Sequence, residues 1–227
     1  MSSQPVPIGT IKAAVFVLAL GPLARLLLVG TTGAWGGLGA NPVEFVTRST
    51  GTWTLVFLCI TLAITPARRL SGWNWLQRLR RMLGLFAFFY GALHFTTYFW
   101  LDQWFDLAAI ARDIVKRPFI TMGFTAFVLM IPLAVTSTDA MVRSLGRRWG
   151  KLHRLVYAVA IAAILHYWWH KAGKNDFSEV GWYCRGGDWA AWLAAGRSMA
   201  QASGAARAGL RFGKGQRQVV LRLLNRD

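Results

Sequence analysis

Apolar runs of about 17 to 20 residues alternate with short polar segments along the chain. A run of this length rises about 30 Å as an α-helix, which is the thickness of the hydrocarbon core of a bilayer. The pattern therefore predicts an all-α fold, a polytopic membrane helix bundle with five clear transmembrane helices. The expected spans are Ile11–Gly30, Thr50–Thr65, Leu83–Leu101, Pro118–Thr136 and Lys151–His170. Pro66 is expected to end the second span.

The polar segments differ in charge, and this difference predicts how the helices cross the membrane. Segment 67–82 has five arginines and no acid, and segment 137–150 has three arginines and one acid. Segment 102–117 has three acids and three bases. Because Lys and Arg are enriched in cytoplasmic loops, the first two segments and the N-terminus are expected inside and the third segment outside. Tryptophans near the ends of the runs are typical of the two membrane interfaces.

The end of the chain departs from this pattern. A sixth helix should return the chain to the cytoplasm, but from Arg185 onward there are eight basic residues and two acidic ones, among many polar positions. We therefore separate a transmembrane domain, residues 1–175, from an atypical basic C-terminal tail, residues 176–227, whose sixth helix is degenerate, altered or absent. Two explanations stay open: an amphipathic surface helix over Trp189–Ala206, or an altered reading frame. No internal repeat and no soluble catalytic domain is visible.

Composition narrows the chemistry. The chain has 227 residues, 55% of them hydrophobic, and a net charge of +17. Such a charge can indicate nucleic-acid binding, but these bases lie in short segments between apolar runs, where they set topology. Cys59 and Cys184 form neither CxxC nor CxxCH, which argues against zinc, a dithiol centre and covalent haem. No glycine-rich nucleotide fingerprint follows a strand, so no NAD(P)H site is expected.

The four histidines carry the candidate chemistry. His153, His166 and His170 lie in the last apolar run, and His94 lies deep in the third. An ionisable residue in a membrane helix is a functional hypothesis by default, and neutral imidazole is a common axial ligand of haem iron. The expected orientation places His94 and His166 at similar depth, nearer the outer face. Since 13 helical residues span about 20 Å, His153 falls near the inner face.

These positions favour a membrane haem protein that carries electrons across the bilayer. His94 and His166 on facing helices are the expected axial pair, because two imidazoles leave the iron no open position and suit electron transfer. His153 is either an interfacial residue or a ligand of a second, inner haem. On one continuous helix it would point to a different side from His166. His170 is expected at the outer interface, as an alternate ligand or as a contact for a partner.

Three arginines are candidates for contact with a haem propionate or a flavin phosphate, because guanidinium matches both anions. They are Arg25, Arg81 and Arg148. The plain alternative is that Arg25 extends to the membrane surface and that the other two set topology. No catalytic residue is expected.

Ten short stretches carry a family resemblance. In chain order they are Asn41–Phe45, Ser49–Gly51, Thr61–Pro66, Arg80–Leu85, Leu93–Tyr98, Lys116–Phe119, Thr136–Met141, Leu145–Trp149, Leu152–Tyr157 and Leu165–Trp169. The ordered set resembles the ferric-reductase-like transmembrane family, which includes NADPH oxidases. Within it, the set is similar to the haem-binding membrane subunits of methionine sulfoxide reductase systems.

The resemblance implies one or two b-type haems held by histidines at the positions of His94, His153 and His166, plus FMN, for which it assigns no residues. It implies a bacterial inner-membrane electron-transfer subunit with no substrate-reducing site of its own. Electrons would come from a cytoplasmic flavin reductase or a membrane quinone. They would go to a periplasmic molybdopterin enzyme, MsrP, which reduces methionine sulfoxide in oxidised proteins. NADPH oxidases have a second histidine near the position of Arg80, so His153 lacks an evident partner.

Two other functions stay open. A stand-alone ferric reductase would use the same haem path, and Asp102, Asp106 and Asp113 at the outer face would attract its cation. A proton-coupled transporter would use the histidines as a proton relay. The last three spans contain no carboxylate, which weakens the transporter reading.

Overall fold

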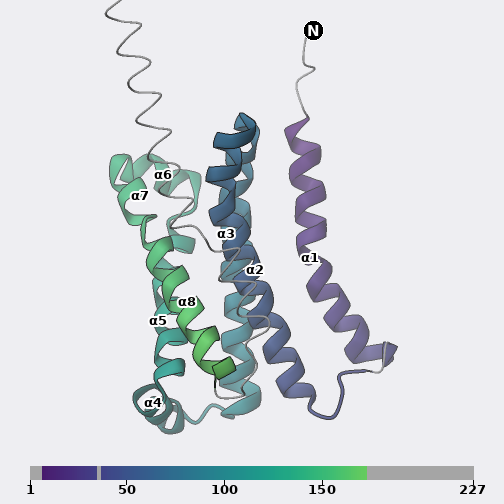
Figure 1. Cartoon of the computed structure of the whole chain (residues 1–227). Coiled ribbons are helices and arrows are strands. Elements are labelled where there is room, and N and C mark those ends of the chain that lie inside the picture. The colour runs from purple at the N-terminus through teal and green to yellow at the C-terminus, as the bar shows by residue number, and fades with distance from the viewer. Residues whose placement is uncertain (1–6, 35–36, 173–227) are drawn as a thin grey trace, which may run out of the picture. The chain divides into compact units, whose positions relative to one another are not determined.

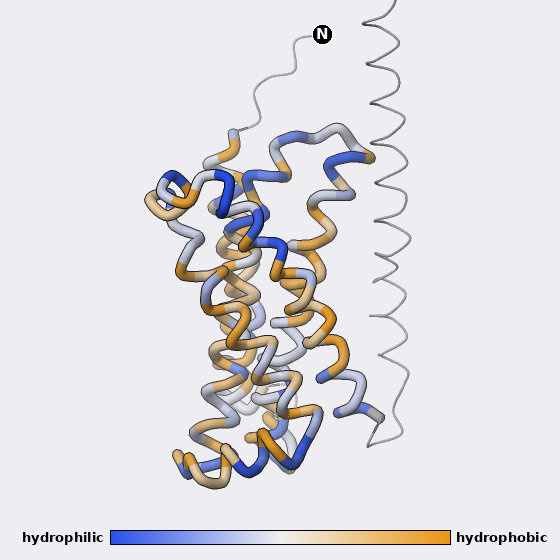
Figure 2. The backbone as a smooth tube through the Cα atoms, turned by 90° about the vertical axis from the view of Figure 1, so that its left-hand side faces the viewer, coloured by the Kyte–Doolittle hydropathy of each residue, from blue (hydrophilic) through white to orange (hydrophobic). Residues whose placement is uncertain are grey.

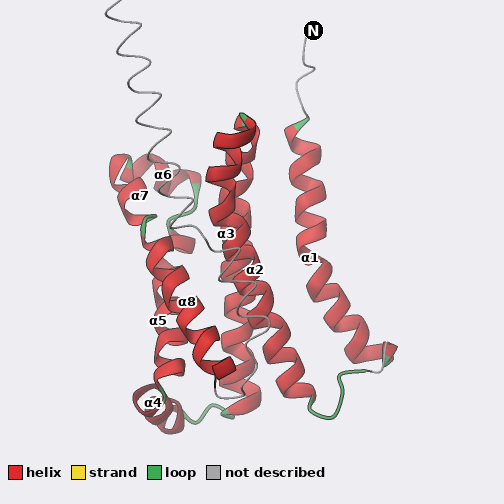
Figure 3. Ribbon diagram, viewed as in Figure 1, coloured by secondary structure: helices red, strands yellow, loops and turns green. Residues whose placement is uncertain are grey.

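The computed structural model describes residues 7–34 and 37–172, and this part of the chain is helical throughout. Figure 3 shows helices joined by loops, and the described residues contain no strand. The predicted all-α fold is therefore confirmed for them. The basic tail, 176–227, and the surface helix expected at Trp189–Ala206 lie outside the described residues.

Within residues 7–34 and 37–172, four helical stretches are long and apolar enough to cross a membrane. They are α1 (Ile8–Thr32), α2 (Pro42–Ser71), the stretch Asn74–Asp102 and α5 (Pro118–Val135). The stretch Asn74–Asp102 consists of η2 (Asn74–Leu76), α3 (Gln77–Thr96) and η3 (Thr97–Asp102), which is a π-helix. In Figure 2 the hydrophobic positions concentrate along the middle of the helices and the hydrophilic ones lie mainly toward their ends.

The fifth expected span is a shorter helix, α8 (Leu155–Ala172), of 18 residues. Two histidines, two tryptophans and a lysine lie near its C-terminal end, and α8 is not among the stretches apolar enough to cross a membrane. The prediction of one continuous helix from Lys151 is wrong, because a turn at His153 and Arg154 separates α7 (Arg147–Leu152) from α8. His153 therefore does not belong to the helix of His166, and the angle calculated for one continuous helix does not apply.

The prediction that Pro66 ends the second helix is also wrong. A proline inside a helix removes one backbone hydrogen bond, and the packing of α2 along α3 outweighs that loss. The helix begins after Asn41, whose side-chain oxygen accepts a hydrogen bond from the Glu44 N–H (3.1 Å). It ends at Gly72, which has a left-handed φ of 73° and donates its N–H to the Arg68 carbonyl (2.9 Å).

The segments expected as loops contain short helices. α4 (Leu107–Lys116) begins after Asp106, whose side chain accepts from the Ala109 N–H (2.9 Å). α6 (Asp139–Leu145) begins after Thr138, whose hydroxyl accepts from the Met141 N–H (3.3 Å). Both are ordinary N-caps. These N-caps are local sequence features that hydropathy does not measure, so the two short helices could not be predicted from the apolar runs.

Two antiparallel helix pairs make up the core. α2 packs along α3, and α5 packs along α8, and these are the two most extensive helix contacts in the described residues. Contacts of α3 with α5 and of α2 with α8 join the pairs. α1 lies beside α2 and α3, at the right of Figure 1. Aromatic rings fill the interior of this region, where Phe57 stacks on Tyr90 with ring centroids 5.3 Å apart.

Tyr90 connects α1 to this core. Its side chain is 1% exposed, and its hydroxyl donates to the Ala19 carbonyl (2.8 Å) and accepts from the Leu23 N–H (3.2 Å). In a regular helix that N–H would bond to that carbonyl. The hydroxyl thus enters the hydrogen-bond ladder of α1 beside Pro22, a residue type that commonly bends helices, and Figure 1 shows that α1 bends along its length.

Replacing Tyr90 with Phe should loosen α1 from the core. The variant loses a hydroxyl that bridges two backbone groups, and one such hydrogen bond is worth about 1 kcal/mol. We expect a lower midpoint of thermal unfolding in detergent. Tyr157→Phe, at a side chain that is 36% exposed, is the matched control. Equal midpoints for the two variants would contradict this role of Tyr90.

Candidate functional site

His94 and His166 meet between the two helix pairs. His94 comes from α3 and His166 from α8, and their ring centroids lie 6.1 Å apart with an interplanar angle of 67°. The sequence places the two residues at similar depth on different helices, and the structure brings their rings together.

Each of these rings donates a hydrogen bond to the backbone of a neighbouring helix. His94 Nδ1 lies 2.9 Å from the Thr47 carbonyl oxygen on α2, and His166 Nδ1 lies 2.6 Å from the Phe119 carbonyl oxygen on α5. A carbonyl oxygen can only accept, so Nδ1 carries the proton in both rings and Nε2 keeps its lone pair. Metal-bound histidines commonly show this arrangement, which fixes the tautomer and raises the basicity of the ligand.

The distance between the two rings is the one expected for two imidazoles that bind one metal ion. With metal–imidazole bonds of about 2 Å, two rings on opposite sides of one metal have centres about 6 Å apart. The observed separation of 6.1 Å agrees with this value. Within the described ranges, no group of three or more His, Cys, Asp and Glu side chains is arranged to hold a metal ion. The donor set is thus a histidine pair, which suits haem better than a zinc-type site.

Phe119 lies against both histidines of the C-terminal end of α8. Its ring centroid is 6.1 Å from that of His166 and 6.0 Å from that of His170. His170 follows His166 by one helical turn and lies against the Phe119 ring. Sequence reasoning missed Phe119, whose backbone oxygen and ring both contact the site, because an apolar residue at the start of a span gives no signal of this role.

A second candidate site is a cavity of about 280 Å³ lined by residues of α2, α3, α5, α7 and α8. Its polar lining consists mainly of Gln77, Arg80, Arg81, Ser137, His153 and Arg154. None of its lining residues in the described part of the chain is acidic. The cavity therefore suits an anionic group.

His153 presents an unpaired nitrogen in this cavity. Its Nδ1 lies 3.1 Å from the Trp149 carbonyl oxygen, and its ring stacks on the Trp149 ring with centroids 3.9 Å apart. The Trp149 indole N–H in turn donates to the Thr136 carbonyl (2.9 Å). His153 Nε2 is buried and makes no hydrogen bond of ordinary geometry among the described residues, although the ring also interacts with the Leu133 backbone. A buried polar atom without a partner is costly, so this nitrogen marks a position where a ligand would be stabilising.

The three predicted arginines lie in different surroundings. Arg81 lines the inner cavity, and its Nη1 lies 2.5 Å from Asp139 Oδ1. Arg25 on α1 and Arg148 on α7 are exposed, and neither lines the cavity. The arginines that do line it beside Arg81 are Arg80 and Arg154. The sequence could have indicated them only by their positions, since Arg80 is next to Arg81 and Arg154 is next to His153.

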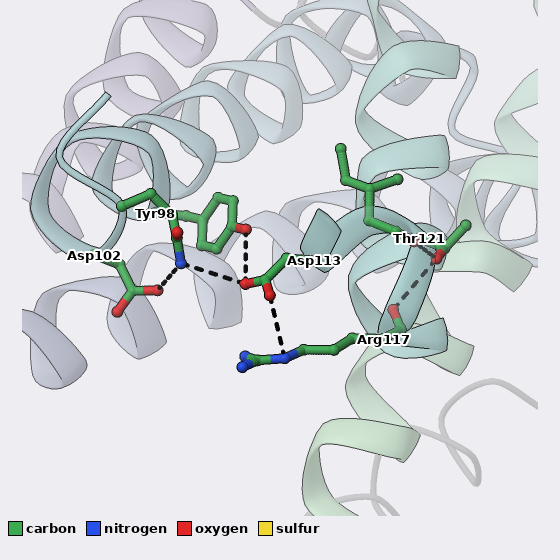
Figure 4. Close-up of polar contacts among 7 residues, drawn as sticks. Tyr98, Asp102, Asp113, Arg117 and Thr121 are labelled. Atoms are coloured by element: carbon green, nitrogen blue, oxygen red, sulfur yellow. Dashed lines mark hydrogen bonds and ion pairs between the residues drawn. The ribbon is translucent and has the colours of Figure 1, made fainter. Parts of the chain in front are cut away.

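The acids of η3 and α4 are held in local contacts (Figure 4). Asp113 accepts from the Tyr98 hydroxyl (3.3 Å) and from Gln103 Nε2 (3.3 Å), and it pairs with Arg117 Nε (3.4 Å). The same Gln103 amide reaches Asp102 Oδ2 (3.2 Å). These bonds fix α4 between η3 and α5 and leave the acids engaged within the fold.

Comparison with known proteins agrees with this architecture. Residues 50–164 match the model of the family described as "Ferric reductase like transmembrane component". A protein-methionine-sulfoxide reductase heme-binding subunit MsrQ from Herminiimonas arsenicoxydans is 62% identical over 78% of this chain and 80% of its own. The MsrQ of Ralstonia nicotianae is 62% identical over 79% and 82%, and that of Rhodospirillum rubrum is 55% identical over 74% and 79%.

The chain is therefore a multi-pass membrane protein of the ferric-reductase-like class. Within that class it belongs to the MsrQ family, because its relatives match it at high identity over about four fifths of their length.

The Arg81–Asp139 pair gives a prediction about pH. The hydrogen bond and the charge of Arg81 lower the pKa of Asp139, and Arg143 lowers it less. A carboxylate whose pKa is lowered by folding stabilises the fold above its ordinary pKa, and this stabilisation is lost as the pH falls through the lowered value.

Arg81→Gln should therefore raise the pKa of Asp139, so that its carboxylate protonates at a higher pH than in the wild type. Carboxyl ¹³C NMR during an acid titration measures this shift. Arg143→Gln is the matched control and should give a smaller rise. A rise at least as large in the control would show that Arg81 is not the main partner.

Proposed function

We propose that the chain is a haem b electron-transfer subunit of the bacterial inner membrane. It takes electrons from the cytoplasmic side, through a flavin reductase or the quinone pool. It passes them to a periplasmic molybdopterin methionine sulfoxide reductase, MsrP, which repairs oxidised proteins. The observation that carries this proposal is the His94–His166 pair, with both Nδ1 atoms bonded to backbone carbonyls. The printed names of the relatives, heme-binding subunits of a protein-methionine-sulfoxide reductase, support the cofactor and the partner.

In this proposal His94 and His166 would hold the haem iron. A haem so held would supply one-electron redox chemistry. The two carbonyl bonds hold the rings in the tautomer that can ligate through Nε2. Two protein ligands would leave oxygen no open position, which favours electron transfer over oxygen chemistry.

The inner cavity is the proposed site of a second group. His153 would offer Nε2 to a second haem iron, and Arg80, Arg81 and Arg154 would hold its propionates. The same three guanidinium groups would equally suit the phosphate of FMN. Arg25 and Arg148 remain candidates for such contacts at the surface. A group at each end of the bundle would give electrons a path from one face of the membrane to the other.

The proposed topology has five spans within residues 1–175 and a cytoplasmic N-terminus. Its support is the distribution of charge. The arginine-rich segments that precede α3 and form α6 and α7 lie at the end of the bundle that holds the inner cavity, and α4 lies at the opposite end (Figure 1). Positive residues favour the cytoplasmic side, so the His94–His166 pair lies nearer the periplasm, where MsrP would accept electrons.

A stand-alone ferric reductase is the second candidate, favoured by the description of the matching family. Its outer cation site would need free acids. Asp102 instead accepts a hydrogen bond from Gln103 and Asp106 accepts one from the Ala109 N–H. Asp113 accepts hydrogen bonds from two side chains and forms an ion pair with Arg117. These contacts favour a protein partner over an iron ion as the acceptor.

His94→Ala and His166→Ala should each abolish the six-coordinate b-type spectrum of the purified protein. Each removes one axial ligand and leaves the other. The measurement is the dithionite-reduced minus oxidised optical spectrum, with haem quantified per chain, and His170→Ala should keep the wild-type spectrum. A wild-type protein that stays haem-free after expression with ample haem would contradict the proposal and favour the proton-coupled transporter.

Electron transfer to purified MsrP, compared with transfer to ferric citrate, separates the two reductase functions.

His153→Ala tests the inner site. If the wild type carries two haems per chain, the variant should carry one, and its remaining haem should keep the spectrum of the His94–His166 site. The measurement is haem content per chain together with a redox titration, in which one of two components should disappear. An unchanged haem content of two would contradict ligation by His153.

A further inference from the structure

Each histidine of the outer pair lies against a glycine of the neighbouring helix. A Cβ atom added at Gly51 on α2 would lie 3.0 Å from both Nδ1 and Cε1 of His94. A Cβ added at Gly123 on α5 would lie 2.7 Å from Nδ1 and 2.9 Å from Cε1 of His166. Contacts under 3.0 Å essentially never occur at a Cβ atom, so a side chain at Gly123 would displace the His166 ring, whereas at Gly51 the His94 ring would have to shift by a few tenths of an ångström.

In both helices the glycine lies one helical turn after the carbonyl that accepts the histidine hydrogen bond. The carbonyl that accepts from His94 is that of Thr47, four positions before Gly51, and the one that accepts from His166 is that of Phe119, four positions before Gly123. In an α-helix each side chain points toward the N-terminus and covers the preceding turn. A side chain at the glycine position would therefore stand over the carbonyl four residues earlier. Its absence gives the imidazole access to that oxygen.

The same arrangement occurs once in each helix pair. In both pairs the first helix supplies the carbonyl and the glycine, and the second supplies the histidine. The donor and acceptor are 47 residues apart in both. The pairs α2–α3 and α5–α8 are thus two copies of one local structure that face each other across the histidine pair. The sequence shows no repeat, because the other positions of these helices need only be apolar.

We propose that Gly51 and Gly123 are positioning residues of the haem site. Each glycine lets one imidazole reach a backbone carbonyl, which fixes the Nδ1–H tautomer and leaves Nε2 as the ligand nitrogen. We call each glycine, together with the carbonyl four residues before it, a cradle, and there is one cradle for each of the two histidines. This inference rests on the proposed function, in which His94 and His166 ligate iron. The added Cβ at Gly123 makes the shorter contacts, so this cradle tolerates a side chain less well than that of Gly51.

Gly51→Ala and Gly123→Ala test the proposal, with Gly21→Ala on α1, where an added Cβ meets nothing within 4 Å, as the control. In each test variant the ring has to turn away from its carbonyl and its bond to iron weakens. We expect part of the haem to become high-spin and to bind carbon monoxide when reduced, more so in Gly123→Ala. Haem should dissociate about 10- to 100-fold faster, the range for loss of an outer partner of a metal-bound histidine. The wild type and Gly21→Ala should stay low-spin and unreactive toward carbon monoxide.

The outcomes separate this inference from the proposed function. If both test variants keep the wild-type spectrum, carbon monoxide response and haem dissociation rate, the positioning role of the two glycines is contradicted and the ligation by His94 and His166 stands. If the wild type binds no haem, both are overturned. Should Gly123→Ala fail to accumulate, Gly51→Ala decides alone, since its contacts of 3.0 Å need only a small displacement. A fall in haem content in which the remaining haem stays low-spin indicates general destabilisation and also overturns the cradle.

Discussion

The structure depends on the hydrogen bond that each outer imidazole donates to a carbonyl of the neighbouring helix. In a membrane interior no water satisfies a ring N–H, so this bond has to be made within the protein. The bonds from His94 to Thr47 and from His166 to Phe119 also tie α3 to α2 and α8 to α5 at one register. A slip of one helical turn, about 5.4 Å, would break them and separate the two rings.

The same physical solution holds α1 in place. Tyr90 places its hydroxyl between the Ala19 carbonyl and the Leu23 N–H, so α1 is also joined to the core by a side chain that bonds to helical backbone. Apolar contacts alone discriminate poorly between registers of helices in lipid, because lipid tails are as apolar as the side chains. A polar side chain that forms a hydrogen bond with one particular backbone group fixes the register of the two helices. Such hydrogen bonds account for the arrangement of the helices better than hydropathy does.

Hydropathy and charge predicted the apolar segments, the all-α class and the similar depth of His94 and His166, because these depend on composition along the chain. The continuation of α2 through Pro66 and the turn at His153 were not predicted, since both depend on packing and local geometry. The acceptors at Thr47 and Phe119 could not be found either. Backbone carbonyls are the same in every residue, and the only trace of their use is a glycine four positions later.

The two candidate sites differ in how their histidines are held. The outer pair bonds to other helices, so the site exists only when both helix pairs have assembled against each other. His153 bonds to Trp149, four residues earlier in the same short segment, and its free nitrogen lies in a cavity that several helices line. Its orientation is therefore set locally, by a turn between α7 and α8. The geometry of the His94–His166 pair is thus fixed by the whole bundle, whereas that of His153 is fixed within one short segment.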